Sequence, residues 1–145
     1  MNREIKFRAW CKNNNKIFNV DEIMLCQRNH WVKGDGDRIF SRDFELMQFT
    51  GINDKDGKEI YDGDILSFDG YMTADNTMGY EPNGYIYDEE SIHQVFWDKA
   101  IAAWGLRFNE EEEEDAKYKR DTRWLMVDGS CKVIGNIFEH PELLT

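Results

Sequence analysis

The segment with the most turn signals lies at residues 46–65, which read LMQFTGINDKDGKEIYDGDI. These signals occur three times within fifteen residues, at Thr50-Gly51, Asp56-Gly57 and Asp62-Gly63-Asp64. Asp-Gly pairs favour tight hairpin turns, because glycine adopts positive φ angles readily. The apolar runs between the turns are short, so the segment predicts short antiparallel strands.

Alternation of apolar and polar residues predicts strands on both sides of this segment. Residues 5–10 read IKFRAW and place Ile5, Phe7 and Ala9 on one face, with Lys6 and Arg8 on the other. The other predicted strands are 16–20, 46–49, 65–68, 93–97, 104–108, 124–127 and 132–138. The polar segments 33–38 and 69–91 predict loops, and the helix candidates are 109–120 and 41–47.

Many short strands between turn signals are typical of a mainly β protein, here a β-rich α+β fold. We expect a small SH3-like or partly open barrel with an N-terminal hairpin, a long loop at 69–91 and few short helices. The length of 145 residues suits a single domain, 1–145. Its possible sub-parts are an N-terminal hairpin region at 1–50 and a barrel-like region at 51–145.

The charge of the chain is strongly asymmetric. The formal net charge is −11, and residues 51–145 alone hold nine basic and 22 acidic residues. Binding to nucleic acid draws mainly on Lys and Arg that neutralise phosphates. Such binding is therefore unlikely, although Lys6, Arg8, Lys12 and Lys16 leave a weak basic patch as an alternative.

Nine residues are candidate contacts for a partner. The consecutive acids form an anionic run that cannot be buried without losing its hydration. Trp31 lies beside His30 in a polar neighbourhood, where a tryptophan is a candidate hot spot. The two tyrosines belong to the long polar segment. The candidates are Glu110, Glu111, Glu112, Glu113, Glu114, Asp115, Trp31, Tyr80 and Tyr85.

Motifs for chemistry are missing from the sequence. It contains no Cys-x-x-Cys pair, no phosphate-binding glycine loop and no Gly-x-Ser-x-Gly elbow. We therefore expect that the protein is not an enzyme and has no catalytic residues. We also expect that it binds no metal, cofactor or small-molecule substrate. A hydrolase site near Asp62, Asp64 and His93 and a Cys–His pairing in space remain as alternatives.

The sequence predicts a cytoplasmic protein. No apolar run approaches the ~20 residues of a membrane span, and the first residues lack an apolar signal core. Three scattered cysteines argue against a disulfide framework. We expect no membrane contact.

Three blocks of the sequence resemble the YopX family of small bacteriophage and prophage proteins. They are residues 5–10, residues 46–65 and residues 133–143, the last reading VIGNIFEHPEL. The resemblance implies a phage or prophage setting, a bacterial host cytoplasm and a β fold with a small barrel-like part. It implies no mechanism and supplies no catalytic residues. The sequence departs from the family pattern at 69–91 and 110–115.

These features predict an accessory protein that works as a non-enzymatic protein-interaction module. Exposed strand edges make self-association, and hence a homo-oligomer, one form of that hypothesis. The alternative is an acidic decoy that occupies the DNA-binding site of a host protein.

Overall fold

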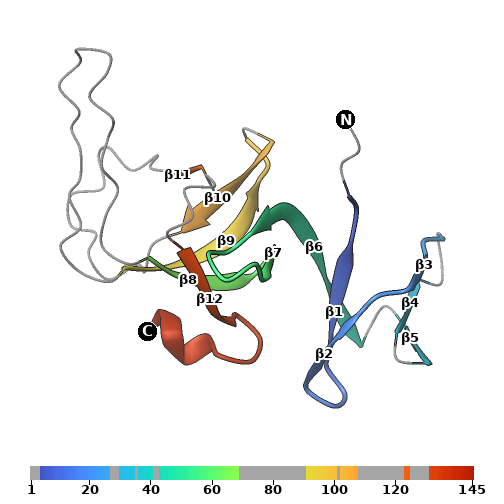
Figure 1. The fold of residues 1–145 in the computed structure, drawn as a ribbon. Coiled ribbons are helices and arrows are strands. Elements are labelled where there is room, and N and C mark those ends of the chain that lie inside the picture. The colour runs from blue at the N-terminus through green and yellow to red at the C-terminus, as the bar shows by residue number, and fades with distance from the viewer. Residues whose placement is uncertain are drawn as a thin grey trace, which may run out of the picture.

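The computed structural model describes residues 4–26, 30–34, 36–40, 43–68, 91–100, 102–107, 123–124 and 131–145. These residues form a mainly β fold with a curled half-barrel sheet (Figure 1), which confirms the predicted class. The elements are β1 (Phe7–Cys11), β2 (Lys16–Asn19), β3 (Glu22–Met24), β4 (Trp31–Gly34), β5 (Asp37–Phe40), β6 (Phe44–Asn53), β7 (Glu59–Tyr61), β8 (Asp64–Phe68), β9 (Ser91–Asp98), β10 (Ala103–Arg107), β11 (Arg123–Trp124), β12 (Cys131–Asn136) and the 3₁₀ helix η3 (Pro141–Leu144).

A four-stranded antiparallel sheet has the order β2-β1-β6-β7. Its long strand β6 runs between the N-terminal strands and the half-barrel (Figure 1). The β6–β7 register shifts between Phe49 and Asn53, and Gly51 within that interval has a φ angle of +90°. The shift lets β6 pair with β1 at one end and with β7 at the other.

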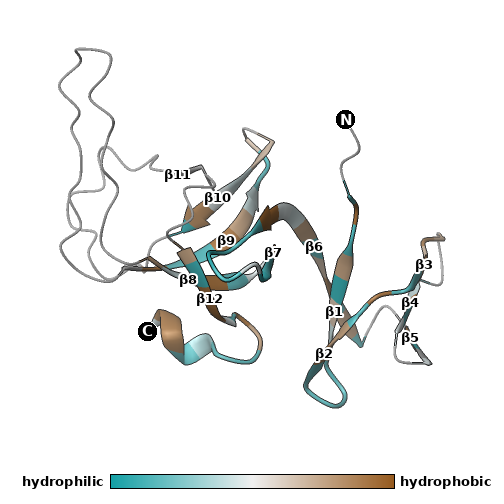
Figure 2. Ribbon diagram, in the orientation of Figure 1, coloured by the Kyte–Doolittle hydropathy of each residue, from teal (hydrophilic) through white to brown (hydrophobic). Residues whose placement is uncertain are grey.

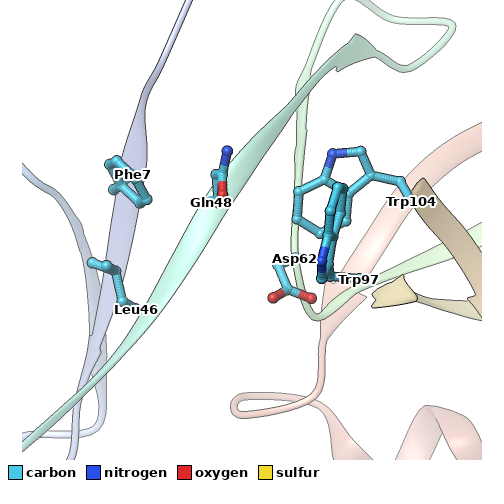
Figure 3. Close-up of a pocket in the computed structure, with 6 residues that line it drawn as sticks. All are labelled: Phe7, Leu46, Gln48, Asp62, Trp97 and Trp104. Atoms are coloured by element: carbon cyan, nitrogen blue, oxygen red, sulfur yellow. The ribbon is translucent and has the colours of Figure 1, made fainter. Parts of the chain in front are cut away.

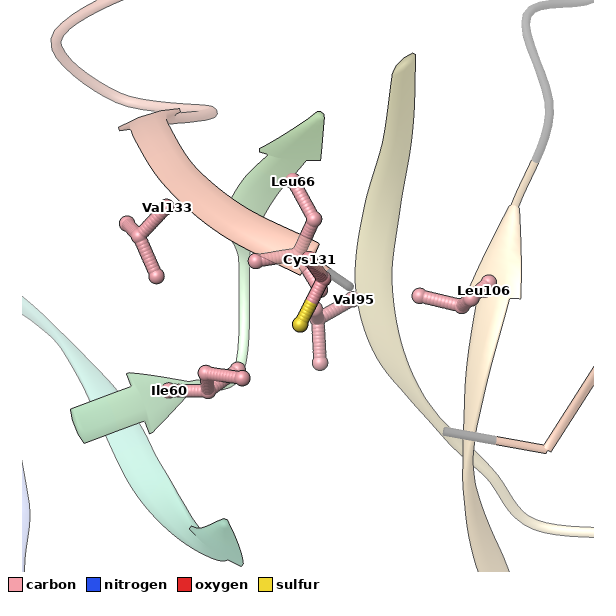
Figure 4. Close-up of a cluster of buried hydrophobic side chains, with 6 residues drawn as sticks. All are labelled: Ile60, Leu66, Val95, Leu106, Cys131 and Val133. Carbon is pink, nitrogen blue, oxygen red and sulfur yellow. The ribbon is translucent and has the colours of Figure 1, made fainter. Parts of the chain in front are cut away.

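The half-barrel is a five-stranded sheet with the order β11-β10-β9-β8-β12. Its concave side holds the largest buried cluster (Figure 4). The members come from four strands of this sheet and from β7: Ile60, Leu66, Val95, Leu106, Cys131 and Val133. Burial of these side chains is the main term holding the sheet in its curled shape.

A third sheet, β3-β4-β5, packs beside the N-terminal hairpin. Ala9, Cys11, Phe18 and Val32 form a second buried cluster there. Figure 2 shows hydrophobic and hydrophilic segments alternating along β1 and β6, as half-buried strands require. A Cβ atom on Gly34 would lie 2.1 Å from the carbonyl oxygen of Asn19, so this close approach requires glycine.

Most strand predictions are confirmed to within about two residues, but two local interpretations are wrong. The helix candidate 41–47 overlaps β6, because Phe44 and Leu46 pack in a sheet and tertiary pairing outweighs weak local propensity. The predicted loop 33–38 contains the ends of β4 and β5, which pair across a tight turn containing Gly36.

Other predictions fall outside the described residues. These are the long loop 69–91 up to residue 90, the helix candidate 109–120 and most of the strand 124–127. The segment after His140, whose Pro141 is compatible with either a helical turn or an extended tail, forms the 3₁₀ helix η3 beginning at Pro141. No helix in the described part of the chain has the length and apolarity to cross a membrane.

Candidate functional site

A pocket of about 240 Å³ lies between the N-terminal sheet and the β9–β10 hairpin (Figure 3). Phe7 and Leu46 stand on one side, and Asp62 with two indoles on the other. Because both sheets supply walls, their relative position sets the width of the pocket. The lining residues are Phe7 from β1, Leu46 and Gln48 from β6, Asp62 from the β7–β8 turn, Trp97 from β9 and Trp104 from β10.

Trp97 and Trp104 are cross-strand partners in the β9–β10 hairpin. Their ring centroids are 5.0 Å apart and their planes are inclined by 70°, an edge-to-face contact that the ring quadrupoles favour. Trp97 is 39% exposed. Among the described residues, none supplies a hydrogen-bond acceptor to the buried Nε1–H of Trp104. An unpaired buried donor costs free energy.

The turn between β7 and β8 presents Asp62 to the pocket. Gly63 has a φ angle of +80°, which favours glycine, and its N–H donates to the Val95 carbonyl at 2.9 Å. The Asp62 N–H donates to the Gln48 carbonyl, also at 2.9 Å. These two bonds attach the turn to β9 and β6, the strands that hold Trp97 and Gln48.

The Asp62 carboxylate is half-buried and forms no ion pair with any residue that the structure describes. Burial raises its pKa above the ordinary aspartate value. The Gly63 N–H partly offsets this rise, and the neighbouring Asp64 charge adds to it. The pocket therefore contains a negative charge with no compensating cation.

Asp64, two residues away, is paired with a cation. Its side chain is 1% exposed, and its Oδ1 lies 2.5 Å from Nη2 of Arg8. The Tyr61 N–H donates to its Oδ2 at 2.9 Å, and the Arg8 guanidinium lies 4.1 Å from the Tyr61 ring centroid. Burial raises the pKa of Asp64, whereas Arg8 and the Tyr61 N–H oppose that rise.

The position of Arg8 corrects a prediction. The alternation of residues 5–10 placed its side chain on the polar face with Lys6, yet that side chain is only 14% exposed. The side chain of Arg8 is covered because it pairs with Asp64 at the start of β8 and lies over the Tyr61 ring. The Arg8–Asp64 pair thus connects the N-terminal sheet directly to the half-barrel.

Glu59 organises the polar groups next to this pair. It forms an ion pair with Lys6 and accepts a hydrogen bond from the Tyr61 hydroxyl at 2.7 Å. Burial, then the bond to Glu59, raises the pKa of Tyr61 to about 12. The Lys6 ammonium, followed by the Tyr61 hydroxyl, holds the pKa of Glu59 below its ordinary value.

The groups proposed for a hydrolase do not converge. Only Asp62 lines the pocket, since Asp64 is engaged by Arg8. His93 is 3% exposed, pairs with Leu66 across the sheet and meets the Phe68 ring at 5.4 Å. Acid–base hydrolysis needs two such groups facing one substrate. Among the described residues, no three His, Cys, Asp or Glu side chains are placed to hold a metal ion.

Of the residues predicted as partner contacts, only Trp31 is described. It is half-buried on β4, and the Arg38 guanidinium lies 4.6 Å from its ring centroid. It does not line the pocket. The acidic run Glu110 to Asp115, together with Tyr80 and Tyr85, lies outside the described residues.

Trp97 and Trp104 fall in the predicted apolar strands 93–97 and 104–108, where core packing is the default interpretation of a tryptophan, so sequence reasoning did not predict the pocket. Trp104 does pack against the core cluster, but Trp97 is partly exposed. Trp97 stands near the end of β9, next to the turn that begins at Lys99, where the hairpin extends past the core it covers. A large aromatic next to a turn was therefore the available signal for an exposed side chain.

Replacing Asp62 with asparagine is expected to stabilise the protein at pH 7, raising Tm by roughly 1–3 °C. A raised folded-state pKa means that the native protein loses stability as the pH rises through that pKa. The advantage of Asp62→Asn should shrink when the pH falls below about 3.9, the ordinary aspartate pKa. Thermal unfolding at both pH values, with Asp21→Asn as the control, checks this. A lower Tm than wild type at pH 7 would contradict it.

The described residues define a mainly β fold with a pocket between two of its sheets. The sequence model of the YopX protein family matches residues 6–145, nearly the whole chain. The chain therefore belongs to the YopX family, as its sequence blocks predicted.

Two further comparisons bear on the fold. The crystal structure of protein EF1440 from Enterococcus faecalis is similar with a TM-score of 0.57 at 21% identity, covering 99% of this chain and 100% of that chain. This likeness shows the shared fold. The UPF0178 protein NT01CX_0440 of Clostridium novyi (strain NT) is 29% identical over 91 residues, 58% of this chain. The chain spans 58% of the length of that relative.

Proposed function

We propose that this YopX family protein is a phage or prophage accessory protein that works as a non-enzymatic protein-interaction module. The pocket between the two sheets, together with the exposed ring of Trp97, is the proposed contact region. The phage setting rests on the family resemblance, and the interaction role rests on the pocket.

The observation that supports this function most is the partly exposed Trp97 at a pocket lined from both sheets. Tryptophans in such settings are enriched among residues that dominate binding energy. A volume of about 240 Å³ lies below the ~300–1,000 Å³ of typical small-molecule sites. It suits one side chain of a protein partner.

The remaining charged groups support a structural rather than catalytic role. Lys6, Arg8 and Lys12 form ion pairs with Glu59, Asp64 and Glu45 respectively. Cations held in this way are less available for phosphate groups or for a substrate. This argues against both the nucleic-acid and the enzyme alternatives.

The alternative is an acidic decoy for a host nucleic-acid-binding protein, and the net charge of −11 favours it. Its contact would be the acidic run at residues 110–115 rather than the pocket. Screening by salt would weaken such a contact strongly.

A pull-down from bacterial host lysate separates the two functions. The tagged wild-type chain is compared with Trp97→Ala, with a variant whose six acids at 110–115 are replaced by glutamine, and with Trp10→Phe as the control for loss of a tryptophan. We expect Trp97→Ala to capture at least roughly fivefold less of the main partner, a loss of about 1 kcal/mol. The other two variants should retain it at high salt.

Two outcomes would overturn the interaction site. One is equal capture by Trp97→Ala and wild type. The other is capture that occurs only at low salt and disappears when the six acids are replaced, which would support the decoy.

A further inference from the structure

We propose that the pocket binds an arginine side chain of the protein partner. Its guanidinium would contact the indoles of Trp97 and Trp104 and form an ion pair with the carboxylate of Asp62. This inference rests on the proposed function and specifies its ligand chemistry.

Charge is the first argument. The Asp62 carboxylate lines the pocket and forms no ion pair with a cation in the described part of the chain. Figure 3 shows it on the same side of the pocket as both indoles. A cation near an aromatic face is attracted by the ring quadrupole, most strongly by tryptophan. The pocket thus combines the two features that favour a cationic occupant.

The second argument comes from the same turn. Gly63 separates two aspartates, and Asp64 already has the proposed arrangement within the chain. The Arg8 guanidinium contacts Asp64 at 2.5 Å while lying 4.1 Å from the Tyr61 ring centroid. Asp62 likewise lies on the same side of the pocket as two aromatic rings, and no arginine is among the described residues that line it. The pocket therefore contains a carboxylate and aromatic rings, the two groups that bind the Arg8 guanidinium at the neighbouring Asp64.

Shape favours arginine over lysine. A guanidinium is planar, stacks on aromatic rings and is more weakly hydrated than an ammonium. Among the described residues three arginines lie over rings, Arg8 over Tyr61, Arg38 over Trp31 and Arg107 over Phe96, against one lysine, Lys6 over Phe49. The apolar wall of Phe7 and Leu46 suits the methylene stem of the side chain.

The test uses the full chain and N-acetyl-arginine methylamide as the probe. Its neutral isostere, N-acetyl-citrulline methylamide, keeps the shape and removes the charge, and N-acetyl-lysine methylamide keeps the charge and changes the shape. Binding is followed through the indole N–H signals in ¹H–¹⁵N spectra. The signals of Trp97 and Trp104 should shift, whereas those of Trp10 and Trp31 should not.

We expect saturable binding of the arginine probe in the millimolar range and at least roughly tenfold weaker binding of the citrulline probe. The lysine probe should bind more weakly than the arginine probe. Asp62→Asn should remove the preference for arginine over citrulline, and Trp97→Ala should weaken both. Asp21→Asn, which removes the same charge in the turn after β2, should leave all three affinities unchanged.

The inference would be overturned if the arginine probe bound no more tightly than the citrulline probe or the lysine probe. It would also be overturned if the preference for arginine over citrulline survived Asp62→Asn, or if binding of the arginine probe did not saturate up to about 50 mM. If partner capture still depends on Trp97 while the arginine preference is missing, this inference fails and the proposed function stands. If the probe binds as expected while capture is independent of Trp97, the proposed function fails instead.

Discussion

Replacing Arg8 with methionine is expected to lower the free energy of unfolding by about 3–5 kcal/mol, the usual cost of removing one partner from a buried ion pair. Methionine fills much of the same volume, but it leaves the Asp64 carboxylate, 1% exposed, with only the Tyr61 N–H. The loss also removes the contact of the guanidinium with the Tyr61 ring. Denaturation in urea at pH 7 measures the effect.

A second substitution tests whether the loss of stability comes from the Asp64 carboxylate that is left buried without Arg8. In the double variant Arg8→Met/Asp64→Asn the amide oxygen can still accept the Tyr61 N–H, and no buried charge remains. We expect it to be at least about 1 kcal/mol more stable than Arg8→Met alone. Lys12→Met breaks the exposed pair with Glu45 and should cost less than about 1 kcal/mol. Equal losses for Arg8→Met and Lys12→Met would refute the role of the buried pair.

Replacing Asp54 with alanine is expected to cost about 2–4 kcal/mol, because its carboxylate accepts three backbone hydrogen bonds. Its Oδ1 accepts from Asp56 at 2.9 Å and from Lys58 at 2.8 Å, and its Oδ2 accepts from Val133 at 3.0 Å. The first two bonds shape the turn between β6 and β7, and the third attaches that turn to β12. Removing the carboxylate leaves the Val133 N–H buried without its acceptor.

The effect of Asp54 should depend on pH in a defined direction. Burial by itself would raise the pKa of Asp54, but the three N–H donors outweigh it and hold the pKa below the ordinary value. A lowered folded-state pKa gives stability that is present above about pH 3.9 and is lost as the pH falls through the folded-state pKa. The difference in the free energy of unfolding between wild type and Asp54→Ala should therefore be largest at neutral pH and smaller in acid.

The control for this measurement is Asp56→Asn. Asp56 is an exposed carboxylate, 3.6 Å from Lys132, and its loss should cost about 0.5 kcal/mol or less. Unfolding midpoints at pH 7 and near pH 3 compare the three proteins. A stability gap for Asp54→Ala that stays constant across this range would contradict the assignment of the charge.

Local chemistry predicted the features that depend on neighbouring residues. The first hairpin follows from alternation around the asparagine turn, and the β7–β8 turn follows from Asp62-Gly63-Asp64. Pairing between distant segments was not predictable in this way. Asp54 and Val133 are 79 positions apart, and Arg8 and Asp64 are 56 apart. No local pattern distinguishes an aspartate that accepts a distant N–H from one that faces water.

The candidate site was less predictable than the fold for the same reason. Its walls come from five segments, and the sequence placed Trp97 in the core because it continues the alternation of His93 and Val95. Both of those residues are buried, whereas Trp97 lies beyond the edge of the cluster. The position at which a hairpin extends beyond the buried core depends on how the sheets pack against each other. Sequence periodicity predicts on which face of a strand a side chain lies, but it does not predict how far the packed core extends along that face.

The placement of β12 beside β8 has a consequence for the protein during its synthesis. Residues 131–136 pair with residues 64–68, so one edge of β8 waits for a strand made more than 60 residues later. At ~5–20 residues per second the ribosome needs roughly 3–13 seconds to cover that interval. For that time the nascent chain exposes an unpaired strand edge, the kind of surface to which other chains add. Protection of this edge by chaperones, or faster translation of residues 69–130, is therefore expected to raise the yield of folded protein.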